Sequence, residues 1–306
     1  MNMNESNSNN IETKKNYIIT SYIKSLTDRA LIYINSGFPI HLRGSAGVGK
    51  TSLAFHIANK IGNTILFICG SEEINDENLI GGYVGIKKYY IEDNFVSSVY
   101  KQKEISDKLW KDGRLLTACK EGYTVIYDEF TRTPSNINNV LLSILEERII
   151  DIPYINYKEY LKINPNFKMI FTSNPDEYIG VYKSPDALLD RMITIDMDSV
   201  DEETERSIII SQTGISAAIA NKITNLSRLI RKNISNKAYA SIRSSIMLAQ
   251  VIQSGKIKMS PTNLNFKNVC RDIYNSSNIS MGLTEEQKND LNTVIDNAIN
   301  IILTEN

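Results

Sequence analysis

Residues 44–51, with the sequence GSAGVGKT, match the pattern G-x-x-x-x-G-K-[ST] at every fixed position. Gly44, Gly47 and Gly49 allow the backbone to curl with its N–H groups pointing inward, toward an anion. The helix expected next offers its positive N-terminus, Lys50 adds a full charge, and Thr51 supplies a hydroxyl for Mg²⁺. This segment, called the P-loop below, predicts a nucleotide phosphate site formed by Gly44, Ser45, Ala46, Gly47, Val48, Gly49, Lys50, Thr51 and Ser52, with ATP and Mg²⁺ as its ligands.

Two adjacent carboxylates, Asp128 and Glu129, end the apolar run of residues 124–127. Beside a P-loop, an acidic residue at the end of a neighbouring strand holds Mg²⁺, so Asp128 is the second predicted metal ligand after Thr51. Hydrolysis also needs a group that orients or deprotonates water, and Glu129 is placed for that role. The alternative, that Glu129 only solvates a strand end, would be preferred if the P-loop were absent.

A polar amide follows another apolar run, in the segment FTSNP at residues 171–175. Asn174 could donate a hydrogen bond to a γ-phosphate or to the attacking water without adding charge, whereas a turn-forming Asn before Pro is the alternative. We predict that Lys50, Glu129 and Asn174 are catalytic.

The elements that must position these residues alternate between apolar strands and helices. Strands are expected at residues 38–42, 64–69, 124–128, 168–174 and 192–197, and helices at 17–37, 50–62 and 136–148. Continuous apolar strands indicate burial on both faces of a parallel sheet. After residue 198 only helical patterns follow, and the last of them begins with a capping box from Thr284 to Gln287.

The domain boundaries expected from these patterns are a disordered polar tail at 1–16, an α/β core at 17–198 and a helical domain at 199–306. The tail has no apolar segment typical of a secretory signal. Three widely spaced cysteines favour reduced thiols and a cytoplasmic location. The two histidines argue against a histidine-based metal site.

Composition restricts the class of partner. Lys and Arg number 34 and Asp and Glu 35, so the formal net charge is −1 and gives no reason to expect nucleic acid or an acidic membrane. Apolar runs are also shorter than the about 18 residues that a membrane span needs.

The order P-loop, VIYDE, TSN, LLDRM and SIRSS resembles the AAA+ ATPases, over residues 17–250. DEFTRTPSNINNVLLSILEER and ENLIGGYVG resemble the MoxR-like branch of the helix-2-insert group. The resemblance implies a P-loop AAA+ αβα sandwich with a parallel sheet, followed by a small all-α lid domain. It also implies a helix-2 insert at about 71–120 and a hairpin insert at about 149–166.

The same resemblance assigns three arginines. Arg191 would be an arginine finger that acts on the nucleotide of a neighbouring subunit, and Arg243 would contact the phosphates from the helical domain. Arg132 would make an intersubunit contact or a contact within the chain. A finger acting in trans implies a ring-like homo-oligomer, hexameric in this family. For each arginine the alternative is an ordinary surface side chain.

Within the branch, LIGGYVG and IFTSNPDEYIGVYKSPDALLDRMITID resemble ATPases of gas vesicle assembly, as does the Tyr that precedes Asp128-Glu129. This implies gas vesicle shell or accessory proteins as clients, and a cytoplasmic, gas-vesicle-associated location. A general chaperone that matures another enzyme, and a structural component that binds ATP without turnover, remain the alternatives. The Tyr-rich segment 83–90 is either a client-contacting loop or a hairpin packed on the core.

Overall fold

The structure, a computed structural model, describes residues 17–93, 101–153, 158–175, 186–197, 200–234, 240–276 and 284–304. The tail expected at residues 1–16 lies outside the described residues.

A five-stranded sheet forms the centre of the α/β part, with the strand order β2-β5-β8-β1-β9. Every neighbouring pair in this sheet is parallel, as predicted from the continuous apolar runs. The strands are β1 (Ile40–Arg43), β2 (Ile65–Cys69), β5 (Thr124–Asp128), β8 (Lys168–Ser173) and β9 (Ile193–Asp196).

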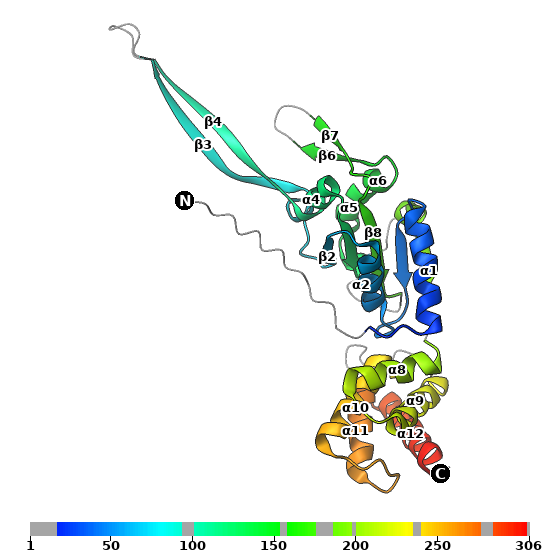
Figure 1. Cartoon of the computed structure of the whole chain (residues 1–306). Helices are drawn as coiled ribbons and strands as arrows, with labels where there is room; N and C mark the ends of the chain where they lie inside the picture. The colour runs from blue at the N-terminus through cyan, green and yellow to red at the C-terminus, as the bar shows by residue number, and fades with distance from the viewer. Residues whose placement is uncertain are drawn as a thin grey trace.

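Successive side chains of the central strands enter two different cores, because strand side chains alternate between the faces of a sheet. Ile126 and Ile170 pack with α1 (Ser21–Asn35) and α2 (Lys50–Ile61) on one face. Val125, Tyr127 and Phe171 pack on the other face, with α4 (Arg114–Glu121) and α6 (Val140–Leu145). The fold is therefore a three-layer αβα sandwich (Figure 1).

The single helix expected at residues 136–148 is wrong in one respect, because the structure divides it into α5 (Ser135–Asn138) and α6. The two helices meet at Asn139, which keeps helical dihedral angles but whose N–H bonds the carbonyl oxygen of Asn136, three residues back, at 3.3 Å. Beside this interruption the buried Asn138 side chain donates from Nδ2 to the carbonyl oxygen of Phe130 at 3.2 Å. The 3-10 turn η1 (Phe130–Arg132) is held against α5 as a result.

Two antiparallel hairpins extend from the sandwich. The longer one joins β3 (Gly81–Asp93) to β4 (Lys101–Asp112), after the short helix α3 (Asp76–Leu79), and Figure 1 shows it reaching far from the body. Tyr83 packs edge-on against Trp110 at its base, with 5.3 Å between the ring centroids. The shorter hairpin joins β6 (Ile149–Pro153) to β7 (Lys158–Lys162).

The chain continues from α7 (Asp186–Leu189) and β9 into a helical region with a hydrophobic core of its own. The helices of this region are α8 (Glu202–Thr213), α9 (Ala217–Lys232), α10 (Ile242–Gly255), α11 (Leu264–Ser276) and α12 (Glu285–Thr304). The capping box predicted before α12 is confirmed, because the Thr284 and Gln287 side chains each accept a backbone N–H of the other residue.

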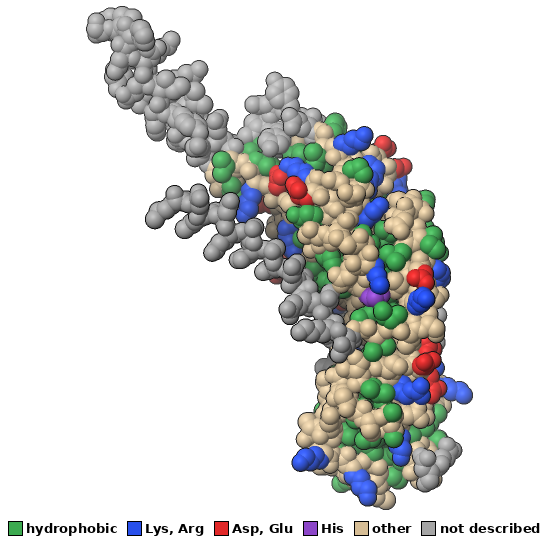
Figure 2. Space-filling model, in the orientation of Figure 1, with side chains coloured by type: hydrophobic (Ala, Val, Ile, Leu, Met, Phe, Trp, Pro, Cys, Tyr) green, Lys and Arg blue, Asp and Glu red, His purple; other side chains and the backbone are tan. Residues whose placement is uncertain are grey.

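None of the described helices combines the length and the apolar character needed to cross a bilayer. On the face shown in Figure 2, Lys and Arg side chains are interspersed with Asp and Glu, in keeping with the near-zero net charge.

Candidate nucleotide-binding site

The P-loop connects β1 to α2, and two of its glycines have left-handed backbone conformations. Gly47 has φ +78° and Gly49 has φ +96°, a region that side chains with a Cβ rarely adopt. Gly49 is the N-cap of α2 and accepts from the N–H of Leu53 at 2.9 Å. The first turn of α2 therefore begins where the loop ends, as an anion site at a helix N-terminus requires.

Lys50 is almost fully buried, and the loop itself holds its ammonium group. Nζ donates to the carbonyl oxygen of Gly44 at 2.7 Å and to that of Ser45 at 2.8 Å. The positive charge is thus fixed at the entry to the P-loop, where it can also serve a phosphate oxygen.

The Asp128 carboxylate, one of the two predicted metal ligands, is in direct contact with the other, the Thr51 hydroxyl. Its Oδ1 accepts from Thr51 Oγ1 at 2.7 Å and from Thr172 Oγ1 at 2.6 Å, and the residue is only 9% exposed. The carboxylate comes from the end of β5 and Thr51 from the first turn of α2. These are hard oxygen donors in contact with each other beside a phosphate loop, a set that fits Mg²⁺.

The described residues contain no cluster of three or more His, Cys, Asp or Glu side chains that could hold a metal ion.

Glu129 has a strained backbone conformation, and a hydrogen bond to the neighbouring strand β8 holds it in place. Its φ of +50° is in the left-handed region, which is uncommon for a residue with a side chain. Its N–H donates to Thr172 Oγ1 at 2.9 Å, so one hydroxyl contacts both the Asp128 carboxylate and the Glu129 backbone. The Glu129 carboxylate pairs with Arg132 Nε at 2.9 Å, so Arg132 contacts Glu129 within the chain.

A buried network positions the turn that carries Glu129 and Arg132. The Tyr127 hydroxyl donates to Thr133 Oγ1 at 2.8 Å, and Asn138 holds the Phe130 carbonyl as described above. Burial raises the pKa of Tyr127 to about 12, so the phenol keeps its proton for this bond. The residues that follow the acidic pair are therefore needed for the geometry of the site.

Asn174 follows β8 at the same edge of the sheet as Asp128, since β5 and β8 are adjacent and parallel. Asn174 is 7% exposed, and the carbonyl oxygen of Ser173 before it accepts from the N–H of Gly44 at 3.3 Å. The start of the P-loop and the strand that carries Asn174 are thus directly bonded.

His41, which sequence reasoning did not select, joins three strands behind the P-loop. Its ring nitrogens contact Ser173 Oγ at 2.8 Å on β8 and Thr194 Oγ1 at 3.1 Å on β9. Burial, aided by the positive charge of Arg43, lowers the pKa of His41 to about 4. A histidine inside an otherwise apolar strand was the signal available in the sequence.

Arg191 follows α7, and its guanidinium is held within its own chain. Nε donates to Glu146 Oε2 at 2.8 Å, Nη2 contacts the same oxygen, and Nη1 donates to the carbonyl oxygen of Ala187. These contacts hold the partly exposed guanidinium between Glu146, just after α6, and Ala187 on α7.

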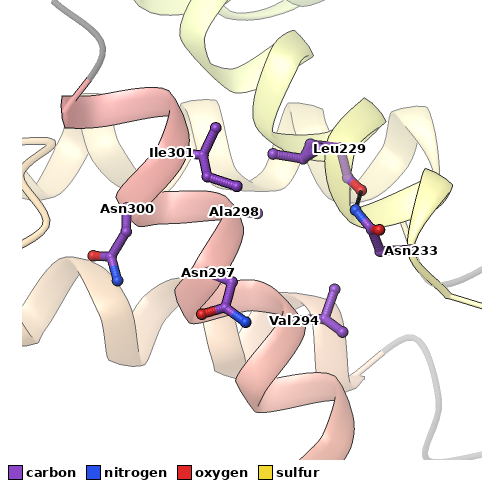
Figure 3. Close-up of a pocket in the computed structure, with 7 residues that line it drawn as sticks. All are labelled: Leu229, Asn233, Val294, Asn297, Ala298, Asn300 and Ile301. Atoms are coloured by element: carbon purple, nitrogen blue, oxygen red, sulfur yellow. Dashed lines mark hydrogen bonds between the residues drawn. The ribbon is translucent and has the colours of Figure 1, made fainter.

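Arg243 lies in the first turn of α10, directly against the P-loop. A Cβ placed on Gly47 would be 2.9 Å from the Ser241 side chain and 3.5 Å from the Cβ of Arg243. The absence of a side chain at Gly47 therefore lets the helical region approach the loop. A pocket of about 500 Å³ between α9 and α12 (Figure 3) contains none of these residues, so we do not assign the nucleotide to it.

Comparison with known proteins agrees with this fold. Residues 39–192 match the model of the AAA domain (dynein-related subfamily). A solved structure of RuvB from Thermotoga maritima superposes with a TM-score of 0.50 at 19% identity, covering 91% of this chain and 79% of RuvB, which shows the fold alone. The fold and site define a P-loop ATPase of the AAA class, which binds ATP.

Two relatives show to which family within the AAA class the chain belongs. The gas vesicle ATPase GvpN of Ancylobacter aquaticus is 38% identical over 264 residues, which span 86% of this chain and 74% of the relative. GvpN of Haloferax mediterranei is 34% identical over 242 residues, which span 78% of this chain and 69% of the relative. The chain belongs to the gas vesicle ATPase GvpN family.

Proposed function

We propose that the protein hydrolyses Mg²⁺-bound ATP at the P-loop and uses the reaction to remodel proteins during gas vesicle assembly. One observation carries the chemistry: Thr51, Asp128 and Glu129 are linked through the Thr172 hydroxyl and the Asp128 carboxylate. The hydroxyl and the carboxylate proposed to hold the metal are thereby joined to the backbone of Glu129, the residue proposed to activate water, at one edge of the sheet.

Each side chain has a separate task in this proposal. The P-loop N–H groups and Lys50 bind the phosphates, while Thr51 and Asp128 hold the ion. Mg²⁺, when bound, neutralises charge on the phosphate oxygens. Glu129 accepts a proton from the attacking water, and Asn174 orients the water or the γ-phosphate by hydrogen bonding.

Arg191 completes the site of a neighbouring subunit, so the active form is a ring-like homo-oligomer, which we take to be hexameric. Its described hydrogen-bond partners, Glu146 and Ala187, lie outside the P-loop, and 28% of its side chain is exposed, which supports this role. Hydrolysis per subunit should then rise with protein concentration, and Arg191→Ala should bind nucleotide but lose about 10³-fold or more of the rate. A dilute monomer that hydrolyses at the full rate would exclude the trans role.

The biological part of the proposal rests on the family. Its members carry the name gas vesicle ATPase, which supports a role at gas vesicles in the cytoplasm and clients among shell or accessory proteins. The β3–β4 hairpin, which extends away from the sandwich in Figure 1, is the surface that we assign to client contact.

Phosphate release by Glu129→Gln, compared with the natural protein and with Glu121→Gln at an exposed position on α4, tests hydrolysis. We expect only Glu129→Gln to lose turnover while it retains ATP. Equal rates in all three proteins would favour a component that binds nucleotide without turnover.

A pull-down with Glu129→Gln and ATP should recover a gas vesicle protein, and recovery of an unrelated enzyme instead would favour a general chaperone.

A further inference from the structure

A fully buried carboxylate lies in the helical region, outside the residues assigned above. Glu205, on α8, has 0% of its side chain exposed. Its Oε1 accepts from Arg231 Nη2 at 2.7 Å and its Oε2 from Arg231 Nη1 at 3.3 Å, so the two groups form a two-point ion pair. Such a pair fixes direction as well as distance.

The remaining donor of Arg231 extends this pair to the backbone that precedes α10. Nε donates to the carbonyl oxygen of Ala240 at 2.8 Å. The Ser245 hydroxyl adds a second connection, since it lies 3.4 Å from Glu205 Oε1 and 3.3 Å from the Ser241 carbonyl oxygen. Ala240 is therefore attached to the Glu205 carboxylate through Arg231, and Ser245, in the first turn of α10, lies beside that carboxylate.

That turn is the one that contacts the P-loop. Ser241 is the N-cap of α10, and its side chain would collide with a Cβ on Gly47. Arg243 lies two residues further on. A shift of Ala240 would therefore move Ser241 and Arg243 relative to the nucleotide site.

A second arginine connects the same carboxylate to the segment that leaves the sheet. Arg228 Nη1 lies 3.4 Å from Glu205 Oε2 and donates to the carbonyl oxygen of Val200 at 3.2 Å. Next to Glu205, the hydroxyl of Thr204 bonds that of Thr20 at the N-cap of α1. Glu205 is thus located where the helical region joins the α/β part.

We propose that Glu205 and Arg231 are positioning residues, which hold the start of α10 at the distance from the P-loop that lets Arg243 act on the nucleotide. A role in stability alone is a poor explanation, because burial of an ion pair costs solvation that packed apolar side chains would avoid. What the ion pair adds is a fixed position for the Ala240 carbonyl group, which Arg231 binds. The inference rests on the function proposed above for Arg243.

Binding of a fluorescent ADP with Mg²⁺ to the full chain tests the proposal. Glu205→Gln keeps the shape of the side chain and removes its charge, and should weaken binding by about fivefold or more. Arg243→Ala should also weaken binding, and the double variant should bind no more weakly than Arg243→Ala alone, because both changes act through one group.

Asp296→Asn is the matched control, since Asp296 pairs with Arg271 elsewhere in the helical region. It should leave ADP affinity unchanged. Thermal unfolding with and without ADP gives a second measurement: Glu205→Gln should reduce the rise in Tm caused by ADP, whereas Asp296→Asn should keep it. If Glu205→Gln does not fold, Arg231→Lys replaces it, because it keeps a positive partner and loses the Ala240 bond.

Natural affinity in Glu205→Gln, or independent losses that multiply in the double variant, would overturn the proposal. Lys50→Ala distinguishes this failure from that of the function itself. If Lys50→Ala binds ADP as the natural protein does, the nucleotide site is wrong; if it loses binding while Glu205→Gln does not, only the positioning role is wrong.

Discussion

Removal of the Thr172 hydroxyl should separate hydrolysis from nucleotide binding. Thr172 is fully buried, and its hydroxyl donates to Asp128 and accepts from the N–H of Glu129. Thr172→Val has nearly the same shape, so the loss of these bonds is the main change. A hydrogen bond to a charged group contributes about 1.5–3 kcal/mol. Since about 1.4 kcal/mol corresponds to a tenfold change in rate, hydrolysis should slow by about ten- to one hundredfold.

Steady-state phosphate release and ADP titration measure the two effects. Nucleotide affinity should change by less than about threefold, because Thr172 makes no described hydrogen bond to the P-loop backbone or to Lys50, and Thr51 still donates to Asp128. Thr172→Ser keeps the hydroxyl and is the control, so it should hydrolyse near the natural rate. Our reasoning is refuted if Thr172→Val hydrolyses normally, or if Thr172→Ser loses as much activity as Thr172→Val.

Two further predictions concern stability, and a third concerns client contact. The pKa of His41 falls from 6.5 to about 4 on folding. The free energy of unfolding should therefore be highest above pH 6.5 and should fall by about 3 kcal/mol as the pH is lowered toward 4. In urea unfolding at each pH, His41→Asn should lack this loss. Gly70→Ala should lower the unfolding free energy by about 1–3 kcal/mol, because its Cβ would lie 2.2 Å from a backbone carbonyl oxygen, whereas Gly85→Ala, with open space around it, should not. Replacing Tyr89 and Tyr90 by Ala should leave Tm and basal hydrolysis unchanged and reduce client capture, and a large drop in Tm would instead favour packing on the core.

Much of the fold followed from local patterns. Continuous apolar runs predicted the strands of the parallel sheet, and the αL glycines Gly47 and Gly62 lie where the motif and the helix end predicted a turn. The helix at 136–148 was predicted as one piece because its periodicity is continuous. The interruption at Asn139 is a change to one i to i−3 hydrogen bond, and Asn138 beside it bonds to Phe130 and Thr133, which belong to a turn that the pattern does not describe.

The sequence by itself determined the residue types and their order, and from these it predicts the chemistry of the site, because the P-loop, the acidic pair and the Asn before Pro each consist of neighbouring residues. Only the tertiary structure decided how these groups are held. Thr172 reaches Asp128 because β8 lies beside β5, and His41 bridges Ser173 and Thr194 because β1 lies between β8 and β9. Strand order and register bring together side chains that are far apart in the chain, and hydrogen bonds act over only about 3 Å, so residue spacing could not identify these partners.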